Sequence, residues 1–167
     1  MSNRSLGDGV GRRLAGPAGA LVAVVAVNAV GAAPAVLAGP DTAWFAALEK
    51  PVIYPPSVTF AVVWTALFTL QGVAVWLVAR GSTGRRRTTT LVAFGLQFVV
   101  NLLWTPTFFG VQWITGALAV AGLLVPAVAV TAWQFGRIDR RAGVLLLPYL
   151  LWAGFATLLT YRFLALN

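Results

Sequence analysis

Apolar residues dominate the chain in long runs, and charged residues occur only in short groups between those runs. The long stretches without Asp, Glu, Lys or Arg are 14–40, 51–79, 88–136 and 142–161. A membrane-spanning helix needs about 20 apolar residues, so the third stretch is long enough for two helices. The pattern predicts an all-α membrane protein, a bundle of five transmembrane helices at about 14–37, 56–79, 88–109, 113–135 and 142–163.

The first apolar run has an alternative interpretation as a cleaved signal peptide, because Arg12 and Arg13 precede Leu14. We favour a retained helix, since the run is long and four others follow it. Residues 1–13 then form a polar cytoplasmic tail, and the 38–55 loop is the longest connection between predicted helices.

The composition excludes several kinds of chemistry. Only 10% of the 167 residues are charged, whereas a soluble domain carries about 25%. The chain has no cysteine and no histidine, which excludes disulfides and thiolate chemistry and removes two common haem ligands. We therefore expect no resident cofactor and no metal site. The net charge of +8 does not indicate a nucleic-acid partner, because the arginines lie at predicted helix ends.

The basic residues divide unequally between the two sides of the predicted bundle. One side holds Arg4, Arg12, Arg13, Arg80, Arg85, Arg86, Arg87, Arg137, Arg140 and Arg141. The other side holds only Lys50 and Arg162. Because cytoplasmic loops are enriched in basic residues, we predict a multi-pass cell-membrane protein with a cytoplasmic N-terminus and the 38–55 loop outside. An even number of helices would spoil this separation.

Polar and aromatic side chains gather at similar depth, towards the 38–55 loop. Trp64 and Phe68 are spaced i, i+4 and share one helix face. The others are Asn28, the stripe of Gln97, Asn101 and Trp104, and the residues Tyr149, Trp152, Ala156 and Thr160. A single buried amide more often only joins two helices. The whole set indicates a ligand cavity, since pockets are mostly apolar with few polar groups.

The remaining tryptophans and the prolines have more ordinary interpretations. The tryptophans near predicted helix ends fit an interfacial belt; they are Trp44, Trp76, Trp113 and Trp133. Three prolines stiffen the 38–55 loop and the start of the second helix, namely Pro51, Pro55 and Pro56. Two interpretations of the loop stay open: a lid over the cavity, to which Trp44 and Lys50 contribute, or a plain connector.

Four motifs in series resemble the translocator protein family, also called the tryptophan-rich sensory protein (TspO/MBR) or peripheral benzodiazepine receptor family. They are WFAALEKPVIYPP (44–56), VWTALF (63–68), LQFVVNLLWTPTFFG (96–110) and PYLLWAGFATLLT (148–160). The similarity covers about residues 15–167, in order and with matching spacing. It implies a bundle of five transmembrane helices, usually a homodimer, with a cavity closed by the loop after the first helix.

The resemblance also implies ligands, namely porphyrins such as protoporphyrin IX and haem, sterols in animal members, and synthetic isoquinoline and benzodiazepine drugs. The positions that match pocket-lining residues of the family are Trp64, Phe68, Asn101, Trp104, Trp152 and Ala156. In bacterial members, two tryptophans that match Trp64 and Trp152 are linked to light-dependent porphyrin breakdown. These two are the only candidate catalytic residues.

The chain departs from the family pattern at three places. Ile53 stands where an aromatic residue is usual, and Thr160 stands where an asparagine is usual. Arg162 directly follows Tyr161, so the spacing of the sterol motif is absent and we expect no dedicated cholesterol site.

Three classes of function remain after these observations. The first is a receptor, sensor or carrier for a tetrapyrrole, whose flat ring suits stacking on tryptophan and whose carboxylates suit Lys50. The second is an enzyme that degrades porphyrin with light and oxygen. Ordinary acid–base catalysis is disfavoured, because every acid lies outside the predicted helices. A transporter ranks last, since the helices show no ion-coupling carboxylate and no evident inverted repeat.

The predicted topology is testable by cysteine labelling, because the chain has no native cysteine. We expect Ala46→Cys to react with a membrane-impermeant reagent on intact cells, and Ser5→Cys to react only after the membrane is opened. Strong labelling at residue 5 with none at residue 46 would invert the topology.

Overall fold

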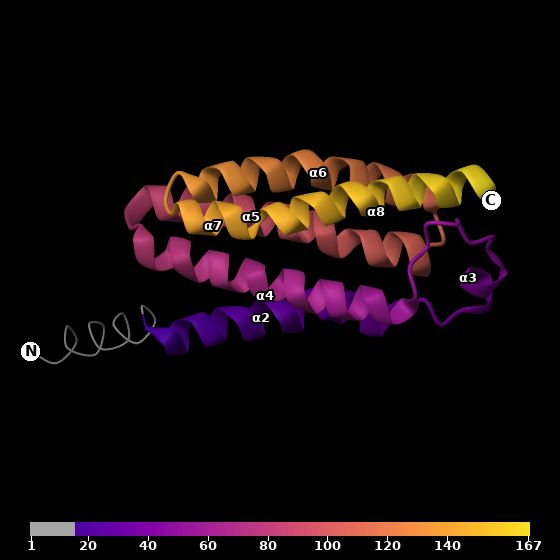
Figure 1. The fold of residues 1–167 in the computed structure, drawn as a ribbon, viewed down its shortest axis with the longest axis horizontal. Helices are drawn as coiled ribbons and strands as arrows, with labels where there is room; N and C mark the ends of the chain where they lie inside the picture. Colours follow the sequence, from indigo (N-terminus) through magenta and orange to yellow (C-terminus); the bar gives the residue numbers. More distant parts are fainter. Residues whose placement is uncertain (1–15) are drawn as a thin grey trace, which may run out of the picture.

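The computed structural model describes residues 16–167, and the regular elements in that range are helices. Five helical segments within it are long and apolar enough to cross a membrane: Pro17–Leu37, Ser57–Gly81, Gly84–Gly110, Ile114–Gly136 and Arg140–Leu166. The predicted all-α class with five spans is therefore confirmed (Figure 1). The predicted tail 1–13 lies outside the described residues, as do Arg4, Ser5, Arg12 and Arg13.

The helices differ from the predicted ranges in detail. They are α2 (Pro17–Leu37), α3 (Ala43–Ala47), α4 (Ser57–Gly81), α5 (Gly84–Thr105), the π-helical turn η1 (Pro106–Gly110), α6 (Ile114–Gly136), α7 (Arg140–Leu145) and α8 (Leu147–Leu166). The 38–55 loop thus contains a short helix, α3, whose first turn is capped by the Thr42 hydroxyl accepting the Phe45 N–H at 3.2 Å.

Prolines explain the two irregular places in the long segments. Pro106 has no N–H to continue the α-helical ladder, so the turn widens and Val111 donates its N–H to the Pro106 carbonyl at 2.8 Å. Pro148 likewise has no N–H for the Val144 carbonyl, and the predicted fifth helix is divided at Leu146 into α7 and α8.

Much of the molecular surface is apolar, as a lipid-facing surface must be. On α2, the side chains of Leu21 and Val25 are 65% and 57% exposed. Threonine hydroxyls within the helices donate to the carbonyl four residues earlier at 2.7–2.8 Å, as in Thr65, Thr69, Thr107, Thr131, Thr157 and Thr160. These hydroxyls need no water, which suits helices surrounded by hydrocarbon.

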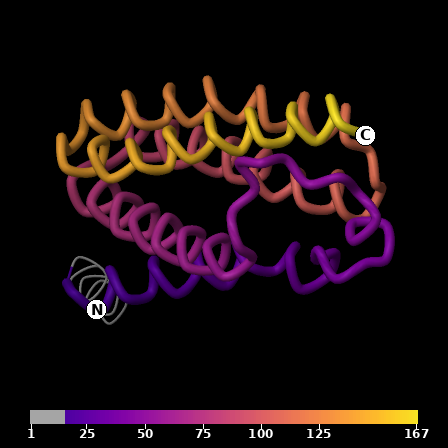
Figure 2. The backbone as a smooth tube through the Cα atoms, turned by 45° about the vertical axis from the view of Figure 1, so that its right-hand side comes forward, coloured from indigo at the N-terminus to yellow at the C-terminus, as the bar shows by residue number. Residues whose placement is uncertain are grey.

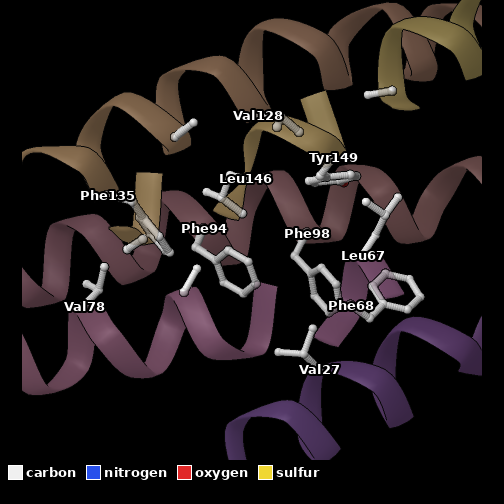
Figure 3. Close-up of a cluster of buried hydrophobic side chains, with 14 of the residues drawn as sticks. Val27, Leu67, Phe68, Val78, Phe94, Phe98, Val128, Phe135, Leu146 and Tyr149 are labelled. Carbon is white, nitrogen blue, oxygen red and sulfur yellow. The ribbon is translucent and has the colours of Figure 1, made fainter. Parts of the chain in front are cut away.

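The helices form two layers (Figures 1 and 2). One layer is α2 packed along α4, and the other contains α5, α6 and α8, with α7 touching both α4 and α6. The main apolar cluster fills the space between the layers, and Figure 3 shows Phe68 beside Phe98 there, with Tyr149 nearby.

The α2–α4 contact depends on small residues. A Cβ added at Gly72 would lie 2.5 Å from the Val24 Cα, so the two backbones meet at this point. A Cβ at Gly31 would lie 2.6 Å from the Phe68 ring, which therefore occupies the gap that this glycine leaves. Gly31 therefore contributes to the packing of α2 against α4 within one chain.

The two ends of the bundle differ in chemistry. At one end, here called the loop end, the 38–55 loop lies beside the C-terminal end of α8 (Figures 1 and 2). At the other end, here called the arginine end, the arginines of residues 80–87 meet those of 137–141. Arg86 donates from its guanidinium to the Arg137 carbonyl across this end.

We predict that Gly72→Ala destabilises the bundle by about 1–3 kcal/mol, because its methyl group meets the α2 backbone, which cannot rotate away. The matched control is Gly95→Ala, whose added Cβ meets nothing within 4 Å, and which should stabilise the helix slightly. Thermal unfolding in detergent measures both. Equal unfolding temperatures for the Gly72 variant and the unaltered protein would contradict the close approach of α2 and α4.

Candidate functional site

A row of aromatic rings joins α4 to α8 near the loop end; we call Phe60, Trp64, Tyr149 and Trp152 the aromatic seam. The Trp64 ring centroid lies 6.5 Å from that of Trp152 and 6.2 Å from that of Tyr149, with the rings edge to face. Phe60 lies 5.9 Å from Trp152 in the same manner. The backbones of α4 and α8 hardly approach each other, and the helices diverge towards the loop end, so rings bridge them (Figure 1).

The helical repeat explains which rings α4 supplies to the seam. Phe60, Trp64 and Phe68 follow one another at i, i+4 on one face. Trp64 stacks on Phe68 at 5.2 Å and 29°, and Phe68 meets Phe98 of α5 at 5.9 Å. The structure thus brings together four of the predicted site residues: Trp64, Phe68, Tyr149 and Trp152.

Trp104 lies in a second aromatic cluster nearer the loop. Its ring stacks on Phe108 at 5.1 Å and 17°, and Trp44 meets the same Phe108 ring at 5.7 Å. Tyr54 links this cluster to the seam, because its ring lies 5.5 Å from Phe60 and 5.7 Å from Phe163. Trp104 is therefore a neighbour of the seam and makes no ring contact with it among the described residues.

The predicted amides occupy three different environments. Asn28 donates from Nδ2 to the Val24 carbonyl at 3.0 Å and to the Thr69 hydroxyl at 3.2 Å, so it joins α2 to α4. Asn101 is buried on α5. Gln97 is buried as well, and neither of its amide atoms has a hydrogen-bond partner among the described residues.

Several buried donors at the seam and near it have no partner in the described protein. They are the Tyr149 hydroxyl and the indole nitrogens of Trp104 and Trp152. A buried polar group without a hydrogen bond costs about 1–3 kcal/mol, so these groups favour any bound molecule that carries acceptors. Ala156 lies half-buried one turn beyond Trp152, and its carbonyl accepts the Thr160 hydroxyl at 2.8 Å.

Sequence reasoning missed Gln71, Phe60 and Asn167. Gln71 is fully buried with both amide atoms unpartnered in the described chain. Its position three residues after Phe68 and seven after Trp64 was the available signal. Phe60 had the same signal, four residues before Trp64, whereas nothing in the pattern pointed to Asn167.

The 38–55 loop is fastened to α8 by one amide side chain. Asn167 accepts the Glu49 N–H at 2.9 Å through Oδ1 and donates to the Glu49 carbonyl at 3.2 Å through Nδ2. The proline residues of the loop differ in burial: Pro51 is buried, Pro55 half-buried, and Pro56 exposed at the start of α4. The loop is therefore attached to the bundle beside the second aromatic cluster.

Lys50 makes its hydrogen bonds within the 38–55 loop. Its ammonium donates to the Phe45 carbonyl and to the Leu48 carbonyl, the latter at 3.1 Å, and lies 3.9 Å from the centre of the Phe45 ring. Desolvation lowers the pKa of Lys50 from its ordinary value of 10.5. In this arrangement the charge stabilises the loop, and a ligand carboxylate would have to replace one of these contacts.

Of the four tryptophans assigned to the interfacial belt, two are exposed and two are packed inwards. Trp113 and Trp133 are 59% and 60% exposed, as a belt requires. Trp76 instead packs on the main apolar cluster with a buried indole nitrogen, and Trp44 packs on Phe108. Their helix-end positions do not reveal this, because a ring at a helix end can turn inwards as well as outwards.

Within residues 16–167, no group of three or more His, Cys, Asp or Glu side chains lies at a distance suited to holding one metal ion. Asp41, Glu49 and Asp139 lie outside the five spanning cores, at loop or helix-end positions.

Comparison with known proteins gives a consistent result. Residues 21–166 match the TspO/MBR family. The chain is 39% identical to a tryptophan-rich sensory protein of Cereibacter sphaeroides over 124 residues, which cover 74% of this chain and 77% of that protein. It is 35% identical to tryptophan-rich protein TspO of Chlorobaculum tepidum, covering 77% and 82%. It is 31% identical to the translocator protein of Bos taurus, covering 71% and 72%.

We predict that Asn167→Ala loosens the 38–55 loop. Losing the acceptor for the Glu49 N–H removes about 1 kcal/mol of protection, so this amide should exchange with deuterium several-fold faster. Asn167→Asp keeps an acceptor oxygen and should retain most of the protection. Unchanged exchange at residue 49 in the alanine variant would show that the loop is held by its other contacts alone.

Proposed function

The chain belongs to the TspO/MBR family of multi-pass membrane proteins, and on that basis we propose that it binds a tetrapyrrole such as protoporphyrin IX or haem. The protein would act as a receptor, sensor or carrier, holding the ligand against the aromatic seam in the half of the bundle beneath the 38–55 loop. The family membership also agrees with the resemblance seen in the four sequence motifs.

The observation that carries this proposal is the way α4 and α8 are joined. Their backbones diverge, and the seam rings meet edge to face, with Trp64 and Trp152 at 87° to one another. Edge-to-face pairs contribute about 0.5–1.5 kcal/mol each beyond area burial. A flat apolar macrocycle that lay on the Trp64 or Trp152 face would replace such contacts with a larger stacked area.

The unpartnered donors favour a ligand with acceptors on its rim. The Tyr149 hydroxyl and the Trp152 indole N–H lie on the same helix, and Gln97 lies across the bundle on α5. Porphyrins carry carboxylates and ring nitrogens that accept hydrogen bonds. Hydrogen bonds to two of these donors would add to the binding free energy from stacking and would fix the orientation of the ring.

We favour the interpretation of the 38–55 loop as a lid over its interpretation as a plain connector. Its contacts with α8 include the Asn167–Glu49 pair, the tilted ring pair of Phe45 with Phe163, and the edge contact of Tyr54 with Phe163. Contacts of this kind are individually weak, so the loop can open at modest cost and close again over a ligand.

We also propose that the protein forms a homodimer in the cell membrane with its N-terminus in the cytoplasm. The concentration of arginines at one end, against Lys50 and Arg162 near the other, supports this orientation.

A second candidate function is photochemical degradation of the bound porphyrin. The contact between Trp64 and Trp152 favours it, because adjacent indoles can share an oxidising equivalent. In such a reaction the excited pigment takes one electron from an indole and passes it to oxygen, which becomes superoxide. The indole cation radical then takes one electron from the pigment and is restored, and the pigment radical combines with superoxide, so the porphyrin is oxidised and oxygen is reduced. The absence of an acid–base pair in the described spans does not matter for this chemistry.

We predict that Trp64→Ala and Trp152→Ala each weaken protoporphyrin IX binding about tenfold or more, since a lost stacked ring costs about 1–3 kcal/mol. The matched control is Trp133→Ala, which removes an indole that is 60% exposed at the arginine end. Titration in the dark, followed by tryptophan quenching, measures the affinity.

The same titration under illumination separates the two functions. If Trp64→Phe and Trp152→Phe retain binding but stop light-dependent loss of pigment absorbance, the tryptophans take part in a reaction and the enzyme is favoured. Equal loss of affinity in all three alanine variants, with unchanged helical content, would contradict the location of the site.

A further inference from the structure

A groove at the arginine end of the bundle combines an apolar floor with a basic rim. It lies between α4 and α7, has a volume of about 610 Å³, and is lined by Val73, Leu77, Asp139, Arg140, Arg141, Val144 and Leu145. None of these residues belongs to the aromatic seam or to the 38–55 loop. The proposed tetrapyrrole site therefore leaves the groove unused.

The apolar floor follows the direction of the helices. Val73 and Leu77 are spaced i, i+4 on one face of α4, and Val144 faces them from α7 with 53% of its surface exposed. From Val73 to Leu77 the α4 axis advances about 6 Å. A leaflet of the bilayer core is about 15 Å thick, so the floor spans somewhat less than half of the leaflet, on its headgroup side.

The exposed Trp133 places the rim at the membrane interface. Its ring is 60% exposed, and the Arg137 guanidinium lies 5.0 Å from the ring centre. Tryptophan rings prefer the level of the lipid headgroups. The arginines at the mouth of the groove are therefore at the depth of lipid phosphates.

The rim carries a net positive charge. Arg140 and Arg141 are exposed and line the groove, and Arg80 continues the α4 face of Leu77 one turn further on. The acid in the lining is Asp139, whose carboxylate already accepts the Arg141 N–H at 2.8 Å. Guanidinium groups bind phosphate oxygens through paired hydrogen bonds, so the rim is suited to a phosphate.

We propose that this groove binds one anionic phospholipid, with its phosphate at Arg140 and Arg141 and an acyl chain along Val73, Leu77 and Val144. The basic rim selects an anionic headgroup, because a zwitterionic one brings a cation next to the arginines. The apolar floor selects a lipid over a soluble phosphate, because a soluble anion gains nothing from it. Basic pockets between transmembrane helices are suited to such headgroups.

The test uses the purified full chain in detergent, titrated with dioleoylphosphatidylglycerol or with dioleoylphosphatidylcholine, and native mass spectrometry counts the lipids retained. We expect one phosphatidylglycerol to be retained in preference to phosphatidylcholine. The double variant Arg140→Gln with Arg141→Gln should lose about tenfold or more in phosphatidylglycerol affinity. The matched control, Arg85→Gln with Arg87→Gln, removes the same charge from the same end outside the groove and should keep the affinity.

Two further arms test the floor and the source of the phosphate. Val144→Trp fills the groove without changing the charge, and it should also abolish the preference for phosphatidylglycerol. Glycerol 3-phosphate should not displace the lipid at equal concentration. Equal losses in the two arginine pairs, full binding by the Val144 variant, or displacement by glycerol 3-phosphate would each overturn the proposal. Unchanged helical circular dichroism and porphyrin affinity show that the variants are folded.

Discussion

The surrounding hydrocarbon supplies no hydrogen-bond partners, and this constraint determines the rest of the structure. Each backbone N–H and C=O within the bilayer must be paired inside its own segment, so the spanning segments are helices. The same constraint turns threonine hydroxyls back onto the carbonyls of their own helix, as in Thr65 and Thr131. Within the described spanning segments, the helical ladder is irregular at Pro106 and before Pro148, where a proline lacks the N–H that would continue it.

Because lipid is as apolar as the helix surfaces, shape rather than the hydrophobic effect holds the helices together. Backbones approach where glycine allows it, as at Gly72 against Val24 and at Gly143, whose added Cβ would lie 2.8 Å from the Gly136 Cα. Where backbones diverge, large rings fill the interval, as Trp64 and Trp152 do between α4 and α8. Close-packed glycine contacts resist change, whereas ring edges can exchange one partner for another. The bundle therefore has a rigid contact along α2–α4 and an adaptable one at the aromatic seam.

The two ends of the bundle carry different kinds of polar group. At the loop end, polar groups such as Lys50 and Asn167 are engaged by backbone atoms, and they hold a loop in place. At the arginine end, exposed guanidinium groups stand over tryptophan rings and around an apolar groove. A ligand that enters beneath the loop and a lipid held at the opposite end would therefore occupy separate sites, and each could be altered without changing the other.

The sequence alone determined the number of spanning helices, because a run of about 20 apolar residues is a local property. It also determined that Trp64 and Phe68 share a face, since helical spacing does not depend on the neighbours. Only the tertiary structure decided that Asn28 bonds to Thr69, that Trp44 packs on Phe108, that Gln71 is buried and that Asn167 holds the 38–55 loop. These pairings depend on which faces of distant helices meet. A helix that is apolar on all sides carries no polar stripe to mark its inner face, and that face is chosen by the fit of glycines and rings between segments far apart in the chain.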